Sequence, residues 1–294
     1  MKLLITGASS TLGKNLASEL LKTGGFSLRL LEHHSPVKIE GCETVKGNIQ
    51  DSESLERACS GMDGVIHMAA LTHSNSPKAY FEVNETGTEN LVRACLSNNV
   101  KRFIFISSSA ASESGGGYGL SKLRAEEKVR NAMQDWVILR PSEVYGPKMD
   151  EGIGKLMEWV RRFPVIPVIG DGSYLMSPVY VDDVIQAIVE VLKNNSLTEK
   201  SLNLCGPEVM TMNEVIDRLS LNQNVRRRKV HLPIWFVKGV IAFLSVFQSK
   251  LAFSDQVPRL LCDKDRSLDA TKAVIAFNPR KIEEGLLSYR IKAS

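Results

Sequence analysis

A tyrosine and a lysine four residues apart, Tyr118 and Lys122, are the side chains in this sequence best suited to chemistry. On a helix, residues i and i+4 lie on one face, so the phenol and the ammonium would be neighbours. An ammonium beside a phenol favours the phenolate and lowers the tyrosine pKa from about 10 toward neutrality. Tyr118 is therefore a candidate general acid and base for a carbonyl or hydroxyl substrate. The same spacing also occurs on ordinary solvated helices. Whether the pair is catalytic therefore depends on the elements that surround it.

A glycine turn near the N-terminus predicts a dinucleotide site. An apolar run, Lys2–Thr6, precedes the turn, and an amphipathic helix over 12–22 follows it. In this order of elements, Gly7 permits the tight turn and Gly13 allows the helix to pack closely on the strand. The N–H groups at the start of the helix then face a pyrophosphate. Ser10 occupies a position that is often glycine, and a purely structural strand–turn–helix is the alternative.

The second expected strand, Ser27–Leu31, ends at Glu32. A carboxylate about twenty residues beyond the glycine turn can accept hydrogen bonds from the adenosine ribose and would repel a 2′-phosphate. This favours NAD as the cofactor over NADP. Protonated His33 or His34 would offset the carboxylate, which leaves NADP as an alternative. A third interpretation is that Glu32 is only a solvated strand end.

Strands and helices alternate along the first half of the chain. Further strands are expected at 45–49, 64–68, 101–107 and 136–139, and helices at 52–59, 80–98 and from residue 118. This alternation predicts an α/β fold with a Rossmann-type, doubly wound parallel sheet. Ligands of such sheets lie beyond the carboxyl ends of the strands. Gly7, Glu32, Ser109 and Tyr118 all fall at that edge, so we expect them to share one crevice.

The pattern becomes less regular after residue 147, which predicts a second, smaller domain. We expect an NAD-binding Rossmann domain over 1–147 and a small C-terminal α/β substrate domain over most of 148–294. The segment 178–194 is expected to return to the Rossmann domain. Substrate specificity would then depend mainly on the second half of the chain.

Composition excludes several classes of function. The chain has 294 residues, 43% hydrophobic and 24% charged, with a net charge of +4, as in an ordinary globular protein. It has no basic stripe with interleaved aromatics, so nucleic acid is not an expected partner. Its five cysteines include no C-x-x-C pair, and no histidine cluster has metal-ligand spacing. We therefore expect reduced core thiols, no metal site, no signal peptide and a cytoplasmic location.

The segment 226–247 is unusual. Four cations, Arg226–Lys229, precede an almost wholly apolar run over 232–247 that only Lys238 interrupts. The run is too short to span a bilayer, but it can lie in the interface with the basic residues on anionic lipid. Peripheral membrane contact through 226–247 is one hypothesis. The other is a helix of the substrate domain whose cations face solvent or a phosphorylated ligand.

Motifs along the whole chain support one family resemblance. They are Thr6-Gly7…Gly13, His67-x-Ala69-Ala70, Asn84…Gly87-Thr88, Ser107-Ser108-Ser109, Tyr118-x-x-x-Lys122, Arg140-Pro141…Tyr145-Gly146-Pro147, Gly170-Asp171-Gly172, Tyr180-Val181-Asp182-Asp183 and Phe277-Asn278-Pro279. Together they resemble the extended short-chain dehydrogenases/reductases, the NAD-dependent epimerase/dehydratase family. The motifs are specific for the family and its fold but not for a substrate.

The resemblance implies roles for individual residues. Tyr118 would be the acid/base, Lys122 would bind the nicotinamide ribose, and Ser109 would hydrogen-bond the reacting oxygen. The implied cofactor-binding residues are Gly7, Ser10, Thr11, Leu12, Gly13, Glu32, Asn48, Ile49, Met68, Ala69, Ala70, Asn84, Ser107, Tyr118, Lys122, Pro141 and Val144. A homodimer formed through the helices around Asn84 and Tyr118 is also implied.

Two departures from the family pattern concern the substrate. Nucleotide-sugar epimerases usually carry Asn at the position of Glu143 and Arg at that of Met176, both near the substrate diphosphate. A carboxylate at residue 143 would repel that group. His73 and Glu143 are the nearest candidates for additional substrate-binding or acid/base groups, beside Ser109.

The sequence thus predicts an NAD(P)-dependent oxidoreductase or epimerase that transfers hydride at a Ser-Tyr-Lys site. A nucleotide sugar or a related hydroxyl or carbonyl compound is the expected small-molecule substrate. The runs 177–183 and 206–208 instead resemble a subgroup related to the NAD(P)H-binding accessory subunit of respiratory complex I. A non-catalytic NAD(P)H-binding protein of a membrane complex is therefore the alternative.

Overall fold

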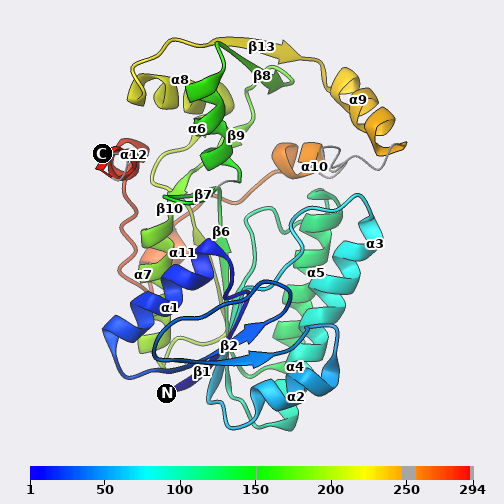
Figure 1. The fold of residues 1–294 in the computed structure, drawn as a ribbon, viewed down its shortest axis with the longest axis vertical. Helices are drawn as coiled ribbons and strands as arrows, with labels where there is room; N and C mark the ends of the chain where they lie inside the picture. The colour runs from blue at the N-terminus through cyan, green and yellow to red at the C-terminus, as the bar shows by residue number, and fades with distance from the viewer. Residues whose placement is uncertain (150, 247–255, 292–294) are drawn as a thin grey trace.

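A seven-stranded, all-parallel sheet forms the larger part of the molecule (Figure 1). The structure is a computed structural model and describes residues 1–149, 151–246 and 256–291. The strands are β1 (Lys2–Thr6), β2 (Ser27–Glu32), β3 (Cys42–Lys46), β4 (Gly64–His67), β5 (Arg102–Ile106), β6 (Asp135–Pro141) and β11 (Lys200–Leu204). Their order, β3-β2-β1-β4-β5-β6-β11, is doubly wound and reverses between β1 and β4. The predicted α/β fold class is confirmed.

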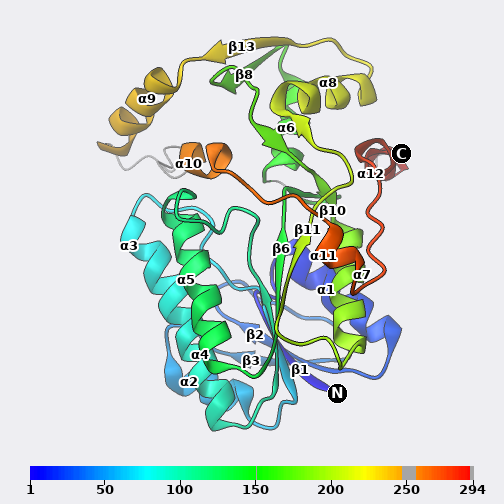
Figure 2. The same cartoon turned by 180° about the vertical axis from the view of Figure 1, so that it is seen from behind.

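Helices cover both faces of this sheet. On one face α1 (Thr11–Thr23) packs against α7 (Val181–Lys193), and on the other α2 (Ser52–Cys59), α4 (Gly87–Ser97) and α5 (Gly116–Ala132) lie side by side (Figures 1 and 2). Each central strand is apolar throughout because its side chains enter two separate cores. Leu3 and Ile5 enter the core beneath α1, for example, and Leu4 enters the opposite one.

The remaining elements form a smaller layer above the carboxyl ends of the strands (Figure 1). Its helices are α6 (Ile153–Arg162), α8 (Met212–Asn222), α9 (Ile234–Val246), α10 (Gln256–Leu261) and α12 (Ile282–Ile291). Its strand pairs are β8 (Val165–Ile169) with β13 (Arg228–Leu232), β9 (Leu175–Met176) with β12 (Met210–Thr211), and β7 (Val144–Tyr145) with β10 (Val179–Tyr180).

Three sequence expectations differ from the structure. The third strand spans Cys42–Lys46 rather than 45–49, because residues 48–51 form the turn that caps α2, in which Asn48 N–H binds the hydroxyl of Ser54. The segment that returns to the sheet reaches Leu204, since β11 pairs in parallel with β6. The helix expected at 80–98 consists of α3 (Pro77–Tyr80), a π-helix over Phe81–Thr86, and α4.

The apolar run expected at 232–247 forms α9, whose described part ends at Val246, so the prediction for residue 247 lies outside the described residues. Within the described parts of the chain, none of the helices combines the length and apolar character of a membrane span. All five cysteines are free thiols, and four are buried while Cys42 is half-buried.

Candidate cofactor and catalytic site

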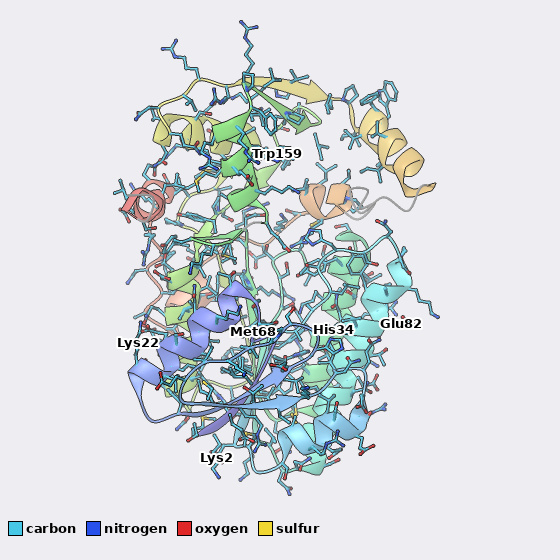
Figure 3. The ribbon with its side chains drawn as sticks, in the orientation of Figure 1. Lys2, Lys22, His34, Met68, Glu82 and Trp159 are labelled. Atoms are coloured by element: carbon cyan, nitrogen blue, oxygen red, sulfur yellow. The ribbon has the colours of Figure 1, made fainter. Side chains whose placement is uncertain are left out.

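A cavity of about 650 Å³ opens where the strand order reverses, beside the ends of β1 and β4. This is the place where doubly wound sheets bind their ligands, and the volume lies in the usual range for cofactor sites. Met68, labelled near the centre of Figure 3, lines the cavity. The predicted cofactor residues found in its wall are Gly7, Ser10, Asn48, Ile49, Met68, Ala69 and Ala70.

The glycine turn requires both of its glycines. Gly7 has a φ of 73°, and a Cβ there would stand 2.7 Å from the amide nitrogen of Ala69. A Cβ on Gly13 would stand 2.5 Å from the carbonyl oxygen of Gly7. Gly7 therefore allows β1 and β4 to end side by side, and Gly13 allows α1 to approach the turn.

Ser10 has a structural role that accounts for its departure from glycine. Its hydroxyl accepts a hydrogen bond from Gly13 N–H at 3.0 Å and donates one to the carbonyl of Gly7 at 2.9 Å. Its own N–H also binds the Gly7 carbonyl. Ser10 is thus the N-cap of α1, and the N–H groups of Thr11 and Leu12 in the first turn have no acceptor within the helix.

Glu32 is oriented differently from the sequence expectation. Its carboxylate accepts the N–H of Val37 at 2.9 Å and is not part of the cavity wall. His33 and His34 line the cavity instead, with ring centroids 3.6 Å apart. Burial and the charge of His34 lower the pKa of His33. Two imidazoles, rather than the Glu32 carboxylate, therefore line the cavity beyond the end of β2.

Tyr118 and Lys122 are both buried on α5, with 5% and 1% of their surfaces exposed. The Lys122 ammonium donates to the carbonyl of Ile106 at 2.9 Å and lies 4.0 Å from the centroid of the Phe105 ring. Burial lowers the pKa of Lys122 to about 7, against an opposing effect from the charge of Glu126. A lysine so deeply buried is unusual unless it has a specific function.

Ser109 lies at the end of β5, where its N–H binds the carbonyl of Pro141 at 2.9 Å. Its hydroxyl makes no hydrogen bond to any residue that the structure describes, and the residue is half-buried. The following loop packs tightly on α5, since a Cβ at Gly119 would stand 2.3 Å from the carbonyl of Ala110. This contact brings the end of β5 close to the helix turn that carries Tyr118.

Ser107 is placed differently from Ser109. Its hydroxyl donates to Glu126 at 2.6 Å, and this wholly buried carboxylate also binds Arg130 and Arg140. The hydroxyl of Ser107 therefore belongs to a buried ionic network beneath the sheet edge. Any contact of Ser107 with a cofactor must involve its backbone.

Asn84 orders the segment between β4 and α5. Its side chain accepts the N–H of Leu71 at 2.7 Å and donates to the carbonyl of Leu71 and to the hydroxyl of Ser121. Ser121 in turn donates to the carbonyl of Tyr118. The π-helix over Phe81–Thr86 contains Asn84, and such single-turn insertions often occur at functional sites.

His67 is structural. Its two ring nitrogens bind the hydroxyls of Thr6 and Thr88, at 2.7 and 2.9 Å, and the side chain is wholly buried. Burial and the charge of Lys122 lower the pKa of His67 to about 3. His67 is thus neutral near pH 7 and connects β1, β4 and α4.

The candidate substrate residues lie around the crevice under the upper layer. Glu143 pairs with Lys264 at 2.6 Å and accepts the N–H of Ser177. Burial raises the pKa of Glu143, but Lys264 and the Ser177 N–H outweigh it and hold that pKa below its usual value. Because Lys264 offsets its charge, Glu143 repels an anionic substrate less than the sequence suggested. Met176 is buried. It occupies the position at which nucleotide-sugar epimerases usually carry an arginine.

His73 and two residues near the upper strands complete the predicted set. The Nδ1 atom of His73 lies 2.9 Å from the hydroxyl of Thr72 and 3.9 Å from Glu151. Pro141 is buried at the end of β6, and Val144 is half-buried in β7.

No motif in the sequence points to Arg259. This residue of α10 places its guanidinium carbon 4.2 Å from the centroid of the Tyr118 ring, and its Nη1 reaches the carbonyl of Thr72 at 3.4 Å. Arg259 thus brings a cation directly over the candidate catalytic phenol. It lies 141 positions after Tyr118, so no local motif could have connected the two.

Comparisons with known proteins agree with this geometry. The profile of the NAD dependent epimerase/dehydratase family matches residues 3–205. The UDP-glucose 4-epimerase of Vibrio cholerae is 25% identical, over 96% of this chain and 92% of that protein. Subunit 9 of the alpha subcomplex of mitochondrial NADH dehydrogenase from Arabidopsis thaliana is 26% identical, over 98% and 74% of the two chains. The UDP-glucose 4-epimerase structure from Thermotoga maritima, solved with UDP-glucose, superposes with a TM-score of 0.80 at 21% identity, over 100% of both chains.

Proposed function

The chain belongs to the NAD-dependent epimerase/dehydratase family, and from this premise we propose that it oxidises or reduces a hydroxyl-bearing carbon of its substrate at Tyr118. The observation that carries this proposal is the burial of Tyr118 and Lys122 together on α5, at the edge of the sheet that holds the cofactor-sized cavity. A purely structural protein would have no need to bury a lysine there without a carboxylate partner on its ammonium.

The cavity fits a dinucleotide. The first-turn N–H groups of Thr11 and Leu12 would bind the pyrophosphate, and the small side chains of Ala69 and Ala70 leave room beyond β4. Asn48 and Ile49 would lie beside the adenine. When bound, the nicotinamide supplies the hydride acceptor and donor. We propose NAD as the cofactor, with NADP as the alternative because His33 and His34 line the cavity.

Four side chains would serve the reaction. The Tyr118 phenol would take or return the hydroxyl proton, and the Ser109 hydroxyl would donate a hydrogen bond to the same substrate oxygen. Lys122 would orient the nicotinamide ribose, in exchange for its present bond to the Ile106 carbonyl. Arg259 would stabilise negative charge on a substrate group beside the phenol.

We propose a nucleotide sugar as the substrate class. The two UDP-glucose 4-epimerases that resemble this chain over nearly its whole length support this class. Arg259 supports it as well, because this cation can balance a diphosphate in place of the missing arginine at Met176, while Lys264 neutralises Glu143. Homodimer formation through α4 and α5 remains a prediction from the family.

Turnover of the purified protein tests this proposal. With NAD and UDP-glucose or other nucleotide sugars, we expect conversion to an epimer, a dehydrated sugar or an oxidised sugar, detected by chromatography. A transient absorbance of the reduced cofactor should accompany it. A protein that binds NAD and converts no sugar, alcohol or ketone contradicts the enzymatic proposal.

The Arabidopsis relative favours a second candidate, an NAD(P)H-binding accessory protein of a membrane complex. This alternative predicts cofactor binding without turnover and a stable association with membrane proteins. It gives no role to Ser109, whose hydroxyl has no partner in the described part of the chain. Ser109→Ala should therefore leave an accessory function intact and impair an enzyme.

A further inference from the structure

Exposed aromatic side chains concentrate at the end of the molecule opposite the seven-stranded sheet. Among the residues that the structure describes, the exposed Trp and Phe side chains are Trp159, Phe163, Trp235 and Phe236. They come from α6, the turn that follows it, and α9, which Figures 1 and 2 place at the far end of the upper layer. Figure 3 labels Trp159 there. We call the exposed side chains of residues 155–165 and 226–240 the distal surface.

The strand pair of the upper layer adds aliphatic residues to this surface. In β8 and β13 the side chains alternate, and the register pairs Arg228 with Val165 and Val230 with Pro167. Ile166 and Val168 point inward and are buried, whereas Val165 and Val230 are 42% and 46% exposed. Apart from Arg228, the outer face of this pair therefore carries apolar side chains, although solvent-facing strand faces are usually polar.

The first half of helix α9 exposes several large apolar side chains. Trp235 is 75% exposed, and Phe236 and Val240 are 45% and 41% exposed. An apolar helix of a globular protein normally buries such side chains against its own core. The only charged residue of α9, Lys238, is exposed as well. This combination of apolar residues and a cation is typical of helices that lie in a membrane interface.

The charge of the distal surface is strongly positive. Residues 155–165 and 226–240 contain eight Lys and Arg but one Asp or Glu, a formal +7, whereas the whole chain carries +4. The remainder of the protein is therefore at −3. In the described part of the chain, Arg161, Arg226, Arg228 and Lys238 have no carboxylate within ion-pair distance, while Arg162 pairs with Glu158 and Lys229 with Asp217.

Two of the four cations at 226–229 bind other parts of the protein. Arg227 donates to the carbonyls of Val160 and Arg161 at the end of α6, which fastens β13 to that helix. Lys229 binds Asp217 of α8. Arg226 and Arg228 alternate with these two residues and face outward. The outward pair is therefore available for a partner.

From these observations we propose that the distal surface binds the surface of a phospholipid membrane that contains anionic lipids. Tryptophan and phenylalanine favour the headgroup boundary, where an apolar body and a wet surface meet. Exposed lysine and arginine near the same plane attract anionic headgroups. In this orientation the rest of the molecule, which has a formal net charge of −3, lies away from the membrane. The proposal does not depend on the proposed enzymatic activity.

Co-sedimentation of the full chain with vesicles tests the proposal. Vesicles of phosphatidylcholine, with and without about one third phosphatidylglycerol, are compared at low and high salt. We expect binding to the anionic vesicles at low salt, release at high salt, and a blue shift of tryptophan fluorescence on binding.

Paired variants identify the surface. Arg226→Glu/Arg228→Glu should weaken binding by at least about 25-fold, since each cation contributes roughly fivefold and is here reversed. Trp235→Ala/Phe236→Ala should weaken it about tenfold and reduce the blue shift to the contribution of Trp159. The matched controls are Lys22→Glu on α1, labelled at the opposite end in Figure 3, and Leu96→Ala on α4, which should bind like wild type.

Three results would overturn the proposal: no binding to anionic vesicles at low salt, equal binding to neutral and anionic vesicles, or equal binding by wild type and Arg226→Glu/Arg228→Glu. All substituted residues are exposed, so unchanged melting temperatures should accompany the expected losses. Conversion of a soluble nucleotide sugar by these variants separates a failure of this proposal from a failure of the enzymatic one.

Discussion

At the scale of single residues, the unusual charged contacts of the protein lie around Tyr118 and Lys122. Lys122 is buried with a carbonyl and an aromatic ring as its contacts, while Arg259 lies over Tyr118. Glu143 and Lys264 form a second buried charge site in the crevice. Such groups reduce stability or add little to it, unless binding or catalysis uses them.

Lys122→Met should remove a pH dependence of folding. The folded-state pKa of Lys122, about 7, lies below the unfolded value of 10.5, so the native state binds this proton less tightly. Wild-type stability should therefore rise as the pH rises from 7 toward 10.5. Without cofactor, the stability advantage of Lys122→Met should shrink by ~3 kcal/mol between pH 7 and 9.5, in urea unfolding. Lys128→Met on the same helix is the control, and an advantage constant with pH would contradict the burial effect.

Lys264→Met should destabilise the protein, because it leaves the Glu143 carboxylate without its cation. Glu143 would keep only the Ser177 N–H, and the free energy of unfolding should fall by about 3–5 kcal/mol. Lys264→Met/Glu143→Gln should recover most of that loss, because no charge then remains buried. Chemical denaturation of the wild type and both variants measures this, and a double variant no more stable than the single one would rule out the charge explanation.

At the scale of elements, two short segments determine the geometry of the site. The glycine turn brings the first turn of α1 against the ends of β1 and β4. The π-helix turns Asn84 inward, so that it connects Leu71 to Ser121 behind Tyr118. The sequence identified the glycine turn because its spacing has a local mechanical reason. It could not reveal the π-helix, because one inserted residue leaves the helical pattern almost unchanged.

Gly13→Ala tests the turn. The added Cβ would stand 2.5 Å from the Gly7 carbonyl, so α1 must move away from the turn. We expect a loss of about 1–3 kcal/mol in stability and weaker NAD binding, measured by calorimetry. Gly239→Ala is the matched helical control, since nothing lies within 4 Å of its Cβ, and it should be neutral or gain up to about 1 kcal/mol. Unchanged NAD affinity in Gly13→Ala would argue against the phosphate role of this turn.

At the scale of the whole molecule, one parallel sheet supports a smaller layer above the carboxyl ends of its strands. The sheet could be predicted because parallel strands buried on both faces are apolar runs separated by helices. The pair of β8 and β13 could not, since its two strands lie about sixty residues apart in the sequence. For the same reason Arg259 and Lys264 were missed, while Glu32 was placed at the cavity although its carboxylate binds Val37.

Arg102 connects the sheet to the segment that returns from the upper layer. It is 2% exposed, pairs with Asp135, and donates to the carbonyls of Val191, Asn194 and Leu197 at the end of α7. Arg102→Met should cost about 3–5 kcal/mol of stability, because these acceptors lose a buried charged donor.

Arg102→Lys should recover only part of that loss, since an ammonium cannot bridge the same acceptors. Arg93→Met, which removes an exposed pair with Glu89, should cost less than about 1 kcal/mol. Thermal unfolding distinguishes these outcomes, and equal losses for Arg102→Met and Arg93→Met would contradict the connecting role.

The most direct test of the central claim is the rate of substrate conversion by Tyr118→Phe, measured beside its affinity for NAD. The variant keeps the ring under Arg259 and removes only the hydroxyl that would carry the proton. We predict that conversion falls at least about 100-fold while NAD affinity is retained. Tyr180→Phe, which removes a hydroxyl bonded to Ser288 in the upper layer, is the matched control and should convert like wild type. Conversion by Tyr118→Phe at the wild-type rate would contradict the assignment of Tyr118 as the acid/base.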